Sequence, residues 1–72
     1  MSKTDAVDHL INIIEDTSKG CTLQMVAMEA LGEAGGNQAI DYLIKYAGAA
    51  TRSSSAHYAA LKALGRASRN AE

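Results

Sequence analysis

The sequence contains no proline, tryptophan or phenylalanine, and its single cysteine is Cys21. Without proline, no helix is broken by a missing backbone N–H or by ring clash. One cysteine cannot close an intramolecular disulfide, and it offers too few ligands for the usual structural zinc site. These absences exclude a disulfide scaffold, and they fit the reducing cytoplasm, where we expect the protein to be.

Large apolar side chains are also scarce. Of the 34 hydrophobic residues in this 72-residue chain, 14 are alanine and only 13 are valine, isoleucine or leucine. A chain this short buries only about 60% of its unfolded surface, so its core is thin and needs close helix packing, a larger assembly, or both. The length excludes a large enzyme fold, and the net charge of −1 excludes a strongly basic nucleic-acid module.

No leader peptide or membrane span is expected. Residues 1–5 lack the basic and then apolar pattern of a signal peptide. The longest dense apolar stretch, residues 10–14, contains Asn12 and is far shorter than the roughly 20 residues that cross a bilayer. We therefore expect a soluble protein.

The sequence repeats itself with a period of 33 residues and without a gap. Ten of the 34 aligned pairs are identical, and only four of those are alanine on alanine. A fixed period of this length is typical of helical repeat proteins. We expect one domain over residues 1–72, with repeat one at about 4–36 and repeat two at about 37–69. Four of the identical pairs are Ala27 with Ala60, Ala30 with Ala63, Leu31 with Leu64, and Gly32 with Gly65.

The apolar spacing predicts two helices in each repeat. We expect Thr4 or Asp5 to cap the first helix and Asn37 to cap the third. The second helices are expected at about 22–34 and 55–69. The first helix of each repeat has an apolar face at i, i+3, i+4 and i+7, formed by Val7, Leu10, Ile11 and Ile14, and then by Ile40, Leu43, Ile44 and Ala47. The faces of the second helices are Leu23, Ala27, Ala30, Leu31 and Ala34, and then Ala56, Ala60, Ala63, Leu64 and Ala67.

A glycine-rich joint separates the repeats and carries a family resemblance. Residues 29–32 read Glu-Ala-Leu-Gly, residues 62–65 read Lys-Ala-Leu-Gly, and Gly35-Gly36 supplies a helix stop. This pattern resembles the short bacterial HEAT-like repeats named after phycobilisome lyases. The sequence departs from the family at two places. Gly36-Asn37 replaces the Asp-Pro of the turn, and Gln24 and His57 replace an arginine near the start of the second helix of the two repeats.

The resemblance implies an all-α fold of four helices, arranged as two stacked HEAT-like helical hairpins in a short right-handed α-solenoid. It also implies binding to other proteins, with the second helices of the repeats forming the contact surface. It does not imply lyase chemistry in so short a chain.

A partner-binding surface is predicted on the second helices. Equivalent positions of adjacent repeats lie side by side, so we expect Glu29 near Lys62 and Glu33 near Arg66. One interpretation is a ladder of surface salt bridges, each worth about 0–1 kcal/mol. The other is a charged rim around an apolar contact centre, where tyrosine and arginine are favoured. The predicted surface consists of Met25, Glu29, Tyr58, Lys62, Arg66 and Arg69.

Tyr42 and Tyr46, one turn apart, form a shoulder with Ile13 beside the core face. Tyrosine commonly buries its ring and keeps its hydroxyl wet, so partial burial between helices explains the shoulder. The alternative is a second contact patch, such as a dimer interface. His9 and His57 lie in helices of different kinds and form no predicted pair. With no acid–base or nucleophile set, we expect no enzyme activity, no cofactor and no metal.

The predicted function is therefore protein binding, as a small adaptor, regulator or assembly factor. One alternative is a homo-oligomeric structural protein, because two repeats leave an apolar stack end exposed. Charge favours head-to-tail contact: residues 1–36 carry −4 and residues 37–72 carry +3. Another, implied only by the family name, is an accessory subunit of a pigment- or cofactor-handling complex. Nucleic acid is not an expected partner, because the cations are few.

Overall fold

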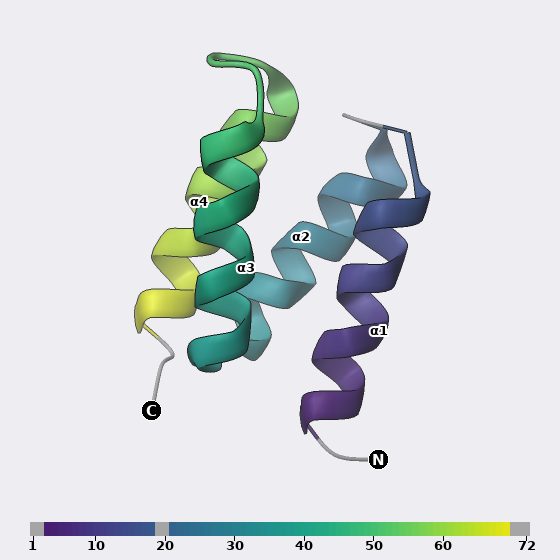
Figure 1. The fold of residues 1–72 in the computed structure, drawn as a ribbon, viewed down its shortest axis with the longest axis vertical. Helices are drawn as coiled ribbons and strands as arrows, with labels where there is room; N and C mark the ends of the chain where they lie inside the picture. The colour runs from purple at the N-terminus through teal and green to yellow at the C-terminus, as the bar shows by residue number, and fades with distance from the viewer. Residues whose placement is uncertain (1–2, 19–20, 70–72) are drawn as a thin grey trace.

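The structure, a computed structural model, describes residues 3–18 and 21–69. Within these residues it contains four helices and no strand (Figure 1). The helices are α1 (Lys3–Asp16), α2 (Thr22–Ala34), α3 (Gly36–Ala49) and α4 (Ser55–Arg69). The all-α class is confirmed, and both second helices have the predicted bounds.

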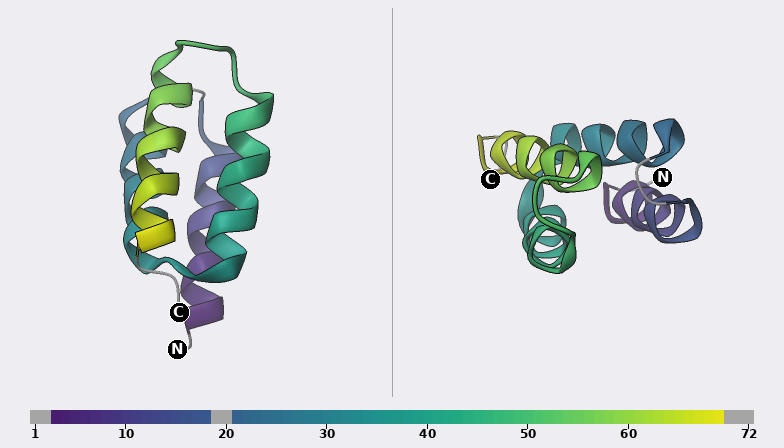
Figure 2. Two further views of the ribbon diagram at one scale, coloured as in Figure 1. Left: turned by 90° about the vertical axis from the view of Figure 1, so that its left-hand side faces the viewer. Right: turned by 90° about the horizontal axis from the view of Figure 1, so that it is seen from above.

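The helices form two hairpins that stack side by side. Helix α1 packs on α2, and α3 packs on α4. The two hairpins meet mainly through α2 and α4, whereas α1 and α3 touch only slightly. Figure 2 shows α2 and α4 in one layer, with α1 and α3 separated in the other. The α2–α4 contact therefore holds the hairpins together.

Close approach of α2 and α4 depends on small residues. The buried residues of α4 are all alanine: Ala56, Ala60, Ala63 and Ala67. Opposite them, a Cβ added to Gly32 of α2 would lie only 2.7 Å from the backbone oxygen of Ala63. No real Cβ tolerates that separation, so glycine permits this crossing.

The buried face of α2 differs from the predicted one. Leu23, predicted to lie in the core, is 56% exposed, whereas Gln24 and Met28 are fully buried. Since α2 lies between α1 and α4, its buried arc must face both neighbours. That arc is therefore shifted away from Leu23 and toward Met28, which lies one turn before Gly32 and so on the side that faces α4.

The turn between the hairpins is made by two glycines rather than by a cap side chain. The N–H of Gly35 donates to the carbonyl of Leu31 at 3.1 Å and closes α2. Gly35 and Gly36 have φ values of 67° and 88°, which favour glycine. Because α3 already begins at Gly36, Asn37 lies in its first turn, and the prediction that it caps this helix is wrong.

The first helix also differs from its predicted start. Helix α1 spans Lys3–Asp16, so Thr4 and Asp5 lie within its first turn and not at its N-cap. None of the described helices combines the length and hydropathy that a membrane span requires.

Candidate partner-binding site

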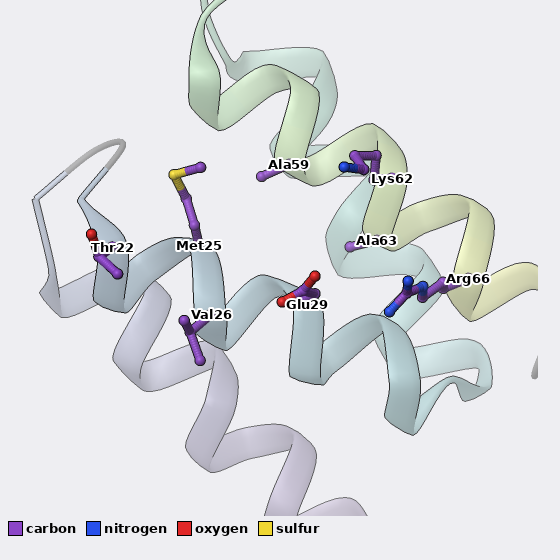
Figure 3. A pocket seen from close by; sticks show the side chains of 8 residues that line it. All are labelled: Thr22, Met25, Val26, Glu29, Ala59, Lys62, Ala63 and Arg66. Atoms are coloured by element: carbon purple, nitrogen blue, oxygen red, sulfur yellow. The ribbon is translucent and has the colours of Figure 1, made fainter.

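A pocket of about 260 Å³ opens on the surface where α2 and α4 run side by side (Figure 3). Each helix contributes four residues at i, i+3, i+4 and i+7, so one stripe of each helix faces the opening. Four of the six residues predicted for partner binding line this α2–α4 pocket. The full lining is Thr22, Met25, Val26 and Glu29 from α2, and Ala59, Lys62, Ala63 and Arg66 from α4.

The pocket is apolar at one end and charged at the other. Figure 3 shows Met25 and Val26 on the N-terminal half of α2, with Ala59 across from them on α4. Toward the C-terminal halves, Glu29 lies with the two basic side chains, Lys62 and Arg66. The site therefore offers an apolar surface bordered by both signs of charge.

An ion pair fixes the charged end. Arg66 Nη1 lies 2.7 Å from Glu33 Oε2, which confirms the expected neighbourhood of these two residues. The pair is exposed, so its contribution to stability is about 0–1 kcal/mol. Glu29 and Lys62 line the same pocket, but no ion pair joins them in the part of the chain that the structure describes. Neither charge is therefore neutralised by the other.

The remaining two predicted residues lie outside the pocket. Tyr58 is exposed on α4, and its ring centroid lies 6.4 Å from that of His57. Arg69, also exposed, is the last residue of α4. Both lie on the same side of α4 as Lys62, at i−4 and i+7, so only part of the predicted surface lines the pocket.

The second predicted patch is anchored in the fold. Ile13, Tyr42 and Tyr46 are half-buried and pack against the core. The rings of Tyr42 and Tyr46 lie 6.2 Å apart, and the Tyr42 hydroxyl donates to Glu15 Oε2 at 2.9 Å. Burial is the main cause that raises the pKa of Tyr42 above its ordinary value, and the hydrogen bond to Glu15 and the charge of Glu15 raise it further. Burial also raises the pKa of Tyr46.

A buried amide joins three helices at this patch. Gln24 of α2, only 1% exposed, donates from Nε2 to the carbonyl of Ile14 in α1 at 2.9 Å. Its Oε1 accepts a hydrogen bond from the Tyr46 hydroxyl of α3 at 3.2 Å. Sequence reasoning did not assign Gln24 this role. The only signal was its place at the position where the resembled family has arginine.

The sulfur and imidazole groups have local structural contacts. Cys21 is the N-cap of α2, where its Sγ accepts from the N–H of Gln24 at 3.4 Å. His57 Nδ1 accepts from the N–H of Ser53 at 3.2 Å. Among residues 3–18 and 21–69, no three histidine, cysteine or acidic side chains gather as metal ligands would.

Comparison with known proteins gives one family. Residues 23–48 match the family model of the PBS lyase HEAT-like repeat. No curated protein and no solved structure matches the chain. The matched segment covers nearly all of α2, the Gly35-Gly36 turn and nearly all of α3, so it spans the joint between the two hairpins. The match covers 26 of the 72 residues, and together with the stacked helical hairpins it makes the chain similar to HEAT-like repeat proteins.

Proposed function

We propose that this protein is an interaction module, an adaptor, regulator or assembly factor that binds a partner protein in the α2–α4 pocket. The observation that carries the proposal is the pocket itself, which combines an apolar surface with Glu29 and Lys62, two opposite charges that no ion pair joins within the described residues. HEAT-like repeats commonly serve protein interaction, so the family match agrees with this role.

The dimensions of the pocket favour a protein side chain over a small molecule. Its volume of about 260 Å³ lies below the roughly 300–1,000 Å³ of typical small-molecule sites. Met25 is flexible and polarizable, which suits it to pack around an inserted apolar anchor. A carboxylate beside that anchor would reach the ammonium group of Lys62. We therefore expect a partner segment with an apolar residue next to an acidic one.

Site-specific photo-crosslinking tests this proposal in two stages. A photoreactive residue at position 25, compared with one at the exposed position Asn12 of α1, identifies proteins that contact the pocket in the native cells. The affinity of the purified partner is then measured for the wild type, for Met25→Ala and for Lys62→Glu. Lys45→Glu, an exposed charge reversal on α3, is the matched control.

The two pocket variants are expected to weaken binding at least about tenfold, which corresponds to the loss of one contact worth roughly 1.4 kcal/mol. The control variant is expected to bind as the wild type does. Unchanged affinity of both pocket variants at unchanged stability would exclude this site.

A further inference from the structure

The exposed large apolar side chains lie on both hairpins and do not line one common surface. In the described part of the chain they are Leu23 and Val26 on α2, Ile44 on α3, and Tyr58 and Leu61 on α4. The 33-residue period relates the positions of one hairpin to those of the other. The α2–α4 contact within the chain can therefore be compared, position by position, with the exposed faces of the two helices.

Within the chain, one side of α2 receives α4. Met28 on this side is 0% exposed, and Gly32 lies against the backbone of Ala63. Thirty-three residues later, the same positions on α4 hold Leu61 and Gly65. Leu61 is 45% exposed, and a Cβ added to Gly65 would meet nothing within 4 Å. Helix α4 thus has, at the equivalent positions, the same face with which α2 receives α4. On α4 no helix of the described residues packs on this face.

The opposite face is present on α2. One side of α4 carries Ala56, Ala63 and Ala67, which are all buried, and Ala63 lies against Gly32 of α2. Their counterparts on α2 are Leu23, Ala30 and Ala34. Leu23 is exposed, and the two alanines are only half-buried. Alanine is kept at position 30, so a glycine of another helix can approach there as Gly32 approaches Ala63.

Charge matches the same arrangement. Within the chain, Glu33 of the first hairpin pairs with Arg66 of the second. In a contact between two copies in the same register, Arg66 of one copy would lie beside Glu33 of the next copy. The signs are again opposite, and the same holds for Lys62 and Glu29.

The layer of α1 and α3 contributes less to such a contact. Within the chain, Gln38 Nε2 donates to Asp8 Oδ1 at 2.6 Å across this layer. The corresponding positions between copies hold Asp5 and Asp41, which carry like charges. The contact between copies is therefore made by the second helices.

We propose that this protein associates head to tail with a second copy of itself. The α4 face around Leu61 and Gly65 of one copy packs on the α2 face around Leu23 and Ala30 of the next, in the register of the internal α2–α4 contact. Such a heterologous contact leaves one unused face at each end and so allows further copies to add. Gly65 and Leu23, the two positions substituted to test this contact, do not line the α2–α4 pocket, so failure of this proposal can be distinguished from failure of the proposed function.

Sedimentation velocity over a series of protein concentrations tests this contact. Gly65→Leu obstructs the α4 face, and Leu23→Lys places a positive charge on the α2 face, opposite the basic α4. The matched control is Gly48→Leu, because Gly48 is also an exposed helical glycine with nothing within 4 Å of an added Cβ. Circular dichroism verifies that each variant is as helical as the wild type.

The mass of the wild type and of Gly48→Leu is expected to rise with concentration, whereas each blocked variant stays at the 7.5 kDa of one chain. An equimolar mixture of the two blocked variants retains one intact α4 face and one intact α2 face, so it is expected to form a dimer and no larger species. A wild type that stays monomeric throughout overturns the proposal. Association of either blocked variant alone, or failure of the mixture to pair when the wild type associates, also overturns it.

Discussion

At the scale of single residues, the repeat places the same amino acid in two different environments. Gly32 and Gly65 are equivalent in sequence, yet Gly32 lies against the backbone of Ala63 and Gly65 has open space beside it. The neighbour of Gly32 is a backbone oxygen, which cannot rotate away as the end of a side chain can. The identity of the residue is therefore explained by contact at one position and not at the other.

Alanine substitutions at these two positions are expected to change stability in opposite directions. Gly32→Ala forces α2 and α4 apart and should lower the free energy of unfolding by about 1–3 kcal/mol, as overpacking does. Gly65→Ala should raise it by roughly 0.5–1 kcal/mol, because alanine is the better helix former. Urea denaturation at low protein concentration measures both effects. Changes of the same sign would contradict the contact geometry.

The hydrogen bonds of the buried Gln24 amide are expected to contribute to the free energy of unfolding beyond what the packing of this side chain contributes. Gln24→Leu leaves the Ile14 carbonyl and the Tyr46 hydroxyl without this partner, and should lower the free energy of unfolding by about 1–3 kcal/mol. Tyr46→Phe removes one of the same hydrogen bonds. The double variant should therefore lose less than the sum of the two single losses. Strict additivity in denaturant unfolding would show that the bond from Tyr46 to Gln24 contributes nothing.

At the scale of helices, α1 and α3 touch only slightly, and side-chain hydrogen bonds join them. One of these contacts, from Tyr42 to Glu15, predicts a dependence of stability on alkaline pH. In the folded protein the pKa of Tyr42 lies above the ordinary 10.0, so the folded state keeps a proton that the unfolded chain releases. The contribution of Tyr42 to the free energy of unfolding should therefore be constant below pH 10 and should fall as the pH rises above it.

Tyr42→Phe should make this alkaline loss of stability smaller, and the part that remains should include the contribution of Tyr46, whose pKa is also raised. Tyr58→Phe, which changes an exposed tyrosine, is the matched control. Urea unfolding at a series of pH values gives the slopes. If the free energy of unfolding falls with alkaline pH equally steeply in Tyr42→Phe and in the wild type, Tyr42 does not cause the fall.

The helices were predictable because their signals are local. The apolar spacing predicted α2 and α4, and Gly35-Gly36 predicted the end of α2. The 33-residue register in addition predicted the contact of Glu33 with Arg66. The buried arc of α2 was not predictable from its own spacing, because it depends on which two helices flank it. Leu23 was for this reason placed in the core, and Gln24 was not.

The pocket was predictable only in part for a related reason. Its four predicted residues follow from the outward face of each helix. Thr22, Val26, Ala59 and Ala63 were not predicted to belong to the site. They line it because α2 and α4 touch at Gly32 and Ala63 and diverge toward Met25, as Figure 3 shows. The angle between two helices depends on contacts distant in sequence, so a helical wheel does not reveal it.

At the scale of the whole molecule, stability in a repeat protein is close to a sum of units and of the contacts between neighbouring units. Two hairpins share one such contact, formed by α2 and α4. A chain of two tandem copies in the same register would form two more hairpins and a contact between the copies. Its unfolding therefore measures whether the α4 and α2 faces fit each other, independently of concentration.

We expect a tandem fusion of two copies of residues 4–69 to be more stable than one copy. Direct joining of residue 69 to residue 4 keeps the 33-residue period, and Ser68→Gly with Arg69→Gly in the first copy supplies the counterpart of the Gly35-Gly36 turn. The urea midpoint should rise, and the slope of the transition should increase because more surface is exposed in one step. The same fusion with Gly65→Leu in its first copy should lose both gains, because the added side chain separates the two copies at the contact. If the unobstructed fusion unfolds at the midpoint and slope of the single copy, the faces of α4 and α2 are not complementary.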